Sequence, residues 1–148
     1  MIKVGVSACV VGDKVRYDGG HKKSGYVANY LNEVFTLMPV CPEVGMGMSV
    51  PRPPIRVVEK DSQHLLLDAK DPAIDNTDSL ADFYNQKSSQ FCDLDGYIFC
   101  AKSPTCGVYR IKVYDEPGNL QHRKGIGLFA QKLIQQFPHL PVEEDGRL

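Results

Sequence analysis

The chain has 148 residues, of which 43% are hydrophobic and 24% are charged, so it is long enough for one soluble domain with a core. A formal net charge of −1 gives no overall positive field for holding nucleic acid, and no apolar run approaches the ~20 residues of a membrane-spanning helix. The start, Met1–Val6, is too short and strand-like for a signal peptide. We therefore expect a cytoplasmic protein, and in that compartment five cysteines favour metal binding or catalysis over disulfides.

The first half of the chain is predicted to form strands joined by irregular loops. Apolar and β-branched runs predict the strands, while Gly-rich and Pro-rich segments at 10–20 and 45–54 predict loops. The elements expected here are strands over 2–7 and 34–40, a short helix from 24 or 25 to 31, and a β-hairpin of strands over 55–60 and 64–68.

The second half alternates between helices and strands. The elements expected here are a helix over 75–91, a strand over 95–101, an edge strand over 108–114, a helix from about 128 to 137 and a last short strand over 142–144. This alternation is typical of an α/β fold. The sequence therefore predicts a single domain over 1–148, with a mainly parallel, Rossmann-like sheet flanked by helices and a β-hairpin insertion.

Three of the cysteines lie at or just beyond the end of a predicted strand: Cys9, Cys41 and Cys106. Ligands of open α/β sheets bind outside the carboxyl ends of the strands, so these thiols are expected to meet at one edge of the sheet. Cys92 ends a predicted helix and Cys100 lies inside a predicted strand. Both are expected to be buried structural residues, because a free Cys packs as a small hydrophobic group.

The spacing of the three thiols predicts a metal site but leaves the metal open. Zinc usually completes a tetrahedron with a fourth Cys or His. None of the four histidines has the short ligand spacing of a zinc knuckle, and the chain contains no CxxC motif. A four-iron four-sulfur cluster is the other option, because thiolates are its usual ligands and three of them would leave one iron open to a substrate.

Polar side chains with chemistry of their own lie beside two of the thiols. Glu43 follows Cys41 by two residues and is suited to the role of general acid or base. Ser103, together with Lys102, precedes Cys106 and is suited to hydrogen-bonding a small polar ligand. Each residue has a simpler interpretation, as a solvated carboxylate or an ordinary Ser-Pro turn.

Two loop cations and two glycines extend this set of candidates. Arg16 and Arg52 are able to bind a carbonyl or phosphate group, although loop cations are usually only solvated. Gly125 and Gly127 precede a predicted helix, whose N-terminus would offer backbone amides to an anion. A lone Gly-x-Gly is more often turn geometry than a binding site.

Taken together, the motifs of this chain resemble those of the bacterial thiouracil desulfidase family. The resemblance covers nearly the whole chain, and the order and spacing of the motifs make it specific. The segments that carry it are Val6-Ser7-Ala8-Cys9, Arg16-Tyr17-Asp18-Gly19, Cys41-Pro42-Glu43, Pro51-Arg52-Pro53, Asp95-Gly96-Tyr97, Lys102-Ser103-Pro104-Thr105-Cys106-Gly107, Gly125-Ile126-Gly127-Leu128-Phe129-Ala130 and Glu143-Glu144-Asp145-Gly146-Arg147-Leu148.

The resemblance implies a [4Fe-4S] cluster held by Cys9, Cys41 and Cys106, with an open iron that binds the sulfur of a thiolated pyrimidine. It implies Glu43 and Ser103 as the catalytic pair of a non-redox desulfidase that converts 2-thiouracil to uracil and sulfide. The family's Ser-Pro-Ser-Cys-Gly motif is Ser-Pro-Thr-Cys-Gly here. Substrate contacts are expected from Ser7, Arg16, Arg52, Lys102, Gly125 and Gly127.

A small thiolated pyrimidine is thus the expected partner, rather than a membrane or a nucleic acid. Some relatives carry an additional C-terminal domain and act on transfer RNA, and we expect no such domain here. The alternative hypothesis is a binding or sensing protein that holds a cluster or zinc without turning over a substrate. Glu43 separates the two hypotheses, because only an enzyme needs its carboxylate for sulfide release.

Overall fold

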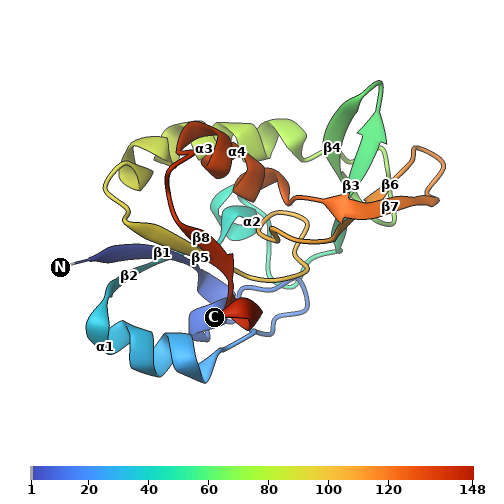
Figure 1. The fold of residues 1–148 in the computed structure, drawn as a ribbon. Coiled ribbons are helices and arrows are strands. Elements are labelled where there is room, and N and C mark those ends of the chain that lie inside the picture. Colours follow the sequence, from blue (N-terminus) through green and yellow to red (C-terminus); the bar gives the residue numbers. More distant parts are fainter. Residues whose placement is uncertain (1) are drawn as a thin grey trace.

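Short apolar strands form a parallel sheet at the centre of the molecule (Figure 1). The computed structural model describes residues 2–148. Strands β1 (Lys3–Ser7) and β5 (Gly96–Phe99) are almost entirely buried and lie in the middle of this sheet, as their unbroken apolar runs predict. Strands β2 (Thr36–Val40) and β8 (Val142–Glu144) flank them, which gives the order β2-β1-β5-β8 with every neighbouring pair parallel.

Helices cover both faces of this sheet. Helices α3 (Thr77–Phe91) and α4 (Leu128–Gln136) lie together on one face, and the π-helical segment η2 (Tyr26–Leu31) continues into α1 (Asn32–Val34) on the other (Figure 1). The remaining helical segments are single turns: η1 (Ala8–Val11), α2 (Pro42–Gly45) and η3 (Asp145–Arg147). Within residues 2–148 no helix combines the length and the apolar character that crossing a bilayer requires. The predicted α/β class and mainly parallel sheet are confirmed.

A second sheet lies beside the first, at one end of the molecule (Figure 1). It consists of β3 (Ile55–Lys60), β4 (Gln63–Asp68), β6 (Ile111–Tyr114) and β7 (Leu120–Gly125) in the order β4-β3-β6-β7. The β3–β4 hairpin was predicted as an insertion, but it pairs in parallel through β3 with β6 and so forms half of this sheet. The β7 strand was not predicted, because its sequence Leu-Gln-His-Arg-Lys-Gly has no apolar alternation.

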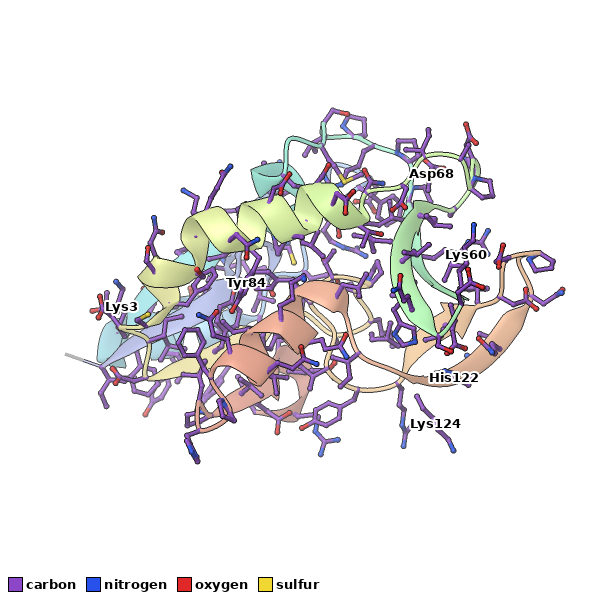
Figure 2. The ribbon with its side chains drawn as sticks, turned by 90° about the horizontal axis from the view of Figure 1, so that it is seen from above. Lys3, Lys60, Asp68, Tyr84, His122 and Lys124 are labelled. Carbon is purple, nitrogen blue, oxygen red and sulfur yellow. The ribbon has the colours of Figure 1, made fainter. Side chains whose placement is uncertain are left out.

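A cluster of aromatic rings joins the sheet to α3 and α4. Phe129 of α4 is fully buried, and its ring centroid lies within 5.7–6.4 Å of those of five other rings, from Phe83, Tyr84, Phe91, Tyr97 and Phe99. Figure 2 shows Tyr84 in the space between the two helices, where its hydroxyl donates to the carbonyl of Lys132 and contacts the side chain of Gln136. Phe83 of this cluster also lies against Gly45, in the segment that follows β2.

The start of α4 packs directly on the loop that follows β5. Gly127 precedes the helix with an extended backbone that any residue can adopt, at φ −58° and ψ 143°. A Cβ atom added there would lie 2.5 Å from the carbonyl carbon and oxygen of Thr105 and 2.8 Å from the backbone nitrogen of Cys106. Gly127 is therefore required for space rather than for conformational freedom.

We expect Gly127→Ala to lower the free energy of unfolding by about 1–3 kcal/mol, because the added methyl group meets backbone atoms that cannot rotate away. Urea denaturation followed by circular dichroism measures this loss. Gly146→Ala is the matched control, since a Cβ there meets nothing within 4 Å. An unchanged unfolding midpoint for Gly127→Ala would show that the Thr105–Cys106 segment moves aside at little cost.

Candidate metal centre

Three predicted thiols line one cavity of about 300 Å³ at the carboxyl ends of the strands. Cys9 lies on η1, directly after β1, and Cys41 follows the end of β2. Cys106 lies on the turn that leaves β5. The parallel arrangement of β1, β2 and β5 thus brings together residues that are far apart in the sequence, as the strand-end argument predicts.

The electrostatics of these thiols reflect their burial and their proximity. Burial raises the pKa of Cys106 to about 12 and is also the main cause of the raised pKa of Cys41. The pKa of Cys9 is raised by a hydrogen bond with Cys100, by burial and by the charges of the other thiols. A site that gathers thiols at this depth disfavours their free thiolate forms, and a bound cation would relieve that cost.

Cys100 is a fourth thiol of this cavity. It lies one residue beyond the end of β5 instead of inside the strand, and its thiol shares the hydrogen bond with Cys9. Its predicted burial is confirmed, since only 4% of the residue is exposed, but it is not an isolated core residue. For Cys92 the prediction of burial is wrong: it caps the end of α3 and is exposed.

The thiols share the cavity without converging on a single point. Across residues 2–148, no group of three Cys, His, Asp or Glu side chains is arranged to hold one metal ion. A tetrahedral zinc site needs its ligands within about 2.0–2.3 Å of one atom. Thiolates are the usual ligands of iron–sulfur clusters, so the chemistry of these donors fits the predicted cluster.

The Cys41-Pro42-Glu43 segment turns as its sequence predicts. Cys41 is extended, at φ −120° and ψ 104°, and the buried Pro42 occupies the first turn of α2. This geometry places the Cys41 thiol and the Glu43 side chain on the wall of the same cavity. The carboxylate of Glu43 is mostly shielded from solvent, with 13% of its side chain exposed.

Arg52 fixes the carboxylate of Glu43 in place. Its Nε donates to Glu43 Oε1 at 3.0 Å, while Nη2 donates to the carbonyl of Val15 at 2.8 Å and Nη1 to that of Ser49 at 3.2 Å. The Arg52 side chain is 4% exposed. All three of its nitrogens are thus engaged with the protein, and Arg52 also lines the cavity, so its predicted contact with substrate stays a prediction beside this positioning role.

A chain of hydroxyl groups links Glu43 to the turn that carries Cys106. Thr105 Oγ1 donates to Glu43 Oε2 at 3.0 Å and lies 3.0 Å from Ser103 Oγ. Ser103 Oγ accepts hydrogen bonds from the backbone N–H groups of Thr105 and Cys106, at 3.2 and 3.0 Å. Because its acceptor positions are used, Ser103 has only its proton to offer to Thr105 or to a ligand.

Residues near the end of the sequence stabilise the turn that carries Cys106 through hydrogen bonds. Glu144, which is 6% exposed, accepts hydrogen bonds from the backbone N–H groups of Val108 and Tyr109 at 2.9 and 3.1 Å. Asp145 accepts one from the N–H of Ala101 at 3.1 Å. The segment with Ser103, Thr105 and Cys106 is therefore anchored on both sides, an arrangement that no local sequence pattern indicates.

The other predicted substrate contacts divide into two groups. Ser7, Arg16 and Lys102 line the cavity, although Ser7 Oγ accepts a hydrogen bond from the N–H of Cys100 at 2.9 Å and so also has a structural role. Gly125 and Gly127 are not among the lining residues. The N–H of Gly127 donates to the carbonyl of Gly107, so this amide is already paired, and the anion site at the start of α4 stays a prediction.

Arg52→Met should lower the free energy of unfolding by about 3–5 kcal/mol, because it leaves the Glu43 carboxylate largely buried without its cation. Urea denaturation of the metal-free protein measures this effect. Arg56→Met is the matched control: Arg56 stacks on Tyr114 and donates to a backbone carbonyl, so it leaves no carboxylate unpaired. The double variant Arg52→Met, Glu43→Gln should recover part of the loss, and equal costs at Arg52 and Arg56 would contradict this account.

Comparison with known proteins agrees with this geometry. The family model of 2-thiouracil desulfurase matches residues 4–145. A solved structure of TudS, a [4Fe-4S]-dependent thiouracil desulfidase, is similar to this chain with a TM-score of 0.74 and 27% sequence identity, and the match covers 100% of this chain and 93% of that chain. No curated protein matches the chain. Because the family model spans nearly all of the sequence, the chain belongs to the 2-thiouracil desulfurase family.

Proposed function

We propose that this protein removes sulfur from a small thiolated pyrimidine, using a [4Fe-4S] cluster held by Cys9, Cys41 and Cys106. The observation that carries the proposal is the meeting of these three thiols and an immobilised carboxylate on the wall of one cavity. In the reaction, 2-thiouracil and water give uracil and hydrogen sulfide, so no net oxidation or reduction is needed. The family match and the similarity to TudS support this assignment.

The donor set fits the cluster and argues for three ligands. Cys9, Cys41 and Cys106 lie on three different segments around the cavity, whereas the Cys100 thiol is hydrogen-bonded to that of Cys9. When bound, such a cluster supplies an iron without a protein ligand, which is thiophilic and acts as a Lewis acid toward the C=S group. All five cysteines are free, in keeping with a reducing cytoplasm.

Glu43 is the general acid or base of this proposal. Arg52 and Thr105 each occupy one carboxylate oxygen, which fixes the plane of the group at the wall of the cavity. Held in this way, Glu43 is suited to take a proton from the water that replaces sulfur and to return a proton to the leaving sulfide. The ion pair is the reason that its side chain has one orientation.

Ser103 acts as a donor in this proposal. Since its oxygen already accepts two backbone N–H groups, its proton can hold the ring carbonyl of the substrate or pass along Thr105 toward Glu43. Thr105 replaces the Ser of the family motif and supplies the same hydroxyl. The cavity, at about 300 Å³, is at the small end of ligand pockets, and a base-sized substrate suits it.

Anaerobic reconstitution of the wild-type chain should give a brown protein with four iron and four sulfide per chain. Cys41→Ala should lose this cluster, as should Cys9→Ala and Cys106→Ala. Cys92→Ala is the control, because its thiol is exposed and outside the cavity. Metal and sulfide analysis together with the visible spectrum measure the cluster content of each variant. A colourless protein that holds one zinc under these conditions would overturn the cluster assignment.

Glu43→Gln should retain the cluster while sulfide release from 2-thiouracil falls by about 10²–10⁴-fold, the usual contribution of a general acid or base. The measurement is anaerobic turnover at equal cluster content. Glu33→Gln, which changes an exposed carboxylate of α1, is the control and should leave the rate unchanged. If Glu43→Gln turns over at the wild-type rate, Glu43 has no catalytic role; if wild type never releases sulfide, the binding or sensing hypothesis replaces the enzyme.

A further inference from the structure

Thr105 is a buried threonine on the wall of the cavity, between the two residues proposed for catalysis. Only 1% of the residue is exposed, and it lies on the turn that leaves β5 and carries Cys106. Its hydroxyl oxygen is 3.0 Å from Glu43 Oε2 on one side and 3.0 Å from Ser103 Oγ on the other. A hydroxyl group has one proton to donate, so the direction of each bond follows from which neighbours can still accept.

The neighbours of Thr105 leave only one acceptor for its proton. Ser103 Oγ already accepts the backbone N–H groups of Thr105 and Cys106, at 3.2 and 3.0 Å, so it has no lone pair left for a third donor. The Cys106 sulfur is 3.7 Å away and is a weak acceptor. The carboxylate of Glu43 is the strongest acceptor within reach. Thr105 therefore donates to Glu43 and accepts from Ser103.

The position of the Thr105 hydroxyl is fixed by the backbone of the turn and by the shape of the side chain. The carbonyl of Thr105 accepts a hydrogen bond from the N–H of Ala130 in α4 at 3.0 Å, and Gly127 lies against the same carbonyl. A β-branched side chain also has few allowed χ1 rotamers. Thr105 therefore holds its hydroxyl group at one place between Ser103 and Glu43.

We propose that Thr105 is a positioning residue that aligns Ser103 and Glu43 with each other through one fixed hydroxyl group. This inference rests on the proposed function. By donating to Glu43 Oε2, Thr105 completes the hold that Arg52 has on Oε1, so both oxygens of the carboxylate are fixed. By accepting from Ser103, it keeps the serine proton in line with the carboxylate until a ligand accepts that hydrogen bond instead. Small losses of such alignment have large effects on rate.

Thr105→Val tests the proposal, because valine keeps the shape of the side chain and removes the hydroxyl. At equal cluster content, kcat for sulfide release from 2-thiouracil should fall at least about tenfold, which corresponds to about 1.4 kcal/mol in the barrier, while KM changes less than about twofold. Thr105→Ser restores the hydroxyl and should recover at least about half of the wild-type kcat. Rescue by serine separates positioning from packing, since serine lacks the methyl group that valine retains.

A second measurement uses the metal-free protein and does not depend on activity. In urea denaturation, Thr105→Val should raise the unfolding equilibrium constant at least about fivefold more when Glu43 is present than in a Glu43→Ala background. The reason is that the hydroxyl loses its acceptor in that background, so its removal costs less there. This double-mutant cycle isolates the contact between the two residues from the other effects of each substitution.

Thr77→Val is the matched control. The Thr77 hydroxyl likewise accepts a backbone N–H, from Leu66, and donates to a carboxylate, that of Asp75, but it lies at the start of α3 and outside the cavity. Thr77→Val should destabilise the protein, leave kcat unchanged and show no coupling to Glu43. The contrast between the two threonines separates alignment of the site from the general cost of losing a paired hydroxyl.

The outcomes distinguish this inference from the proposed function. If wild type releases sulfide and Thr105→Val keeps the wild-type kcat, or Thr105→Ser is as slow as Thr105→Val, the inference fails alone. Absence of coupling to Glu43 in the metal-free protein also overturns it. Should Thr105→Val not fold, Thr105→Ala removes the same hydroxyl, and a wild-type kcat for that variant has the same meaning. A wild type that takes up a cluster but releases no sulfide overturns the proposed function, and this inference with it.

Discussion

The ion pair between Arg52 and Glu43 is the contact on which the geometry of the site depends. It ties the loop after α2 to α2 itself, and through the carbonyl of Val15 it also holds the loop after η1. A charged pair with so little exposure adds little stability relative to an apolar pair, because desolvation offsets most of the attraction. The ion pair instead orients the Glu43 carboxylate, because the Arg52 guanidinium group is itself fixed by hydrogen bonds from all three of its nitrogens.

The core beneath the site is matched to this requirement for fixed geometry. Phe129 packs against rings from both α3 and β5, and Phe83 of the same cluster lies against Gly45 at the end of α2. The aromatic cluster thus supports the Cys41 loop from below, while Gly127 lets the start of α4 support the Cys106 turn. Close packing of this kind transmits small displacements, so the positions of the site loops depend on the packing of the core.

Local patterns in the sequence predict much of the fold, and one topological rule predicts the centre of the site. The apolar runs of β1, β2 and β5 are visible without a structure, and the rule that parallel strands end at one edge brings Cys9, Cys41 and Cys106 together. The contacts of Arg52 and Tyr97 could not be predicted from the sequence. Whether an arginine is solvated or buried depends on partners up to 37 residues away, and local propensity carries no such information.

The hydrogen bonds that assemble the site join distant parts of the chain, and this has a consequence for the order of folding. Thr105 reaches Glu43 across 62 residues, and Cys100 reaches Ser7 across 93. Loops of this length close late, because their entropy must be lost before the contacts form. The thiols are therefore brought together only once both ends of the chain have docked. The cavity proposed to hold the cluster is therefore complete only in the folded chain, in contrast to metal sites whose ligands are neighbours in the sequence.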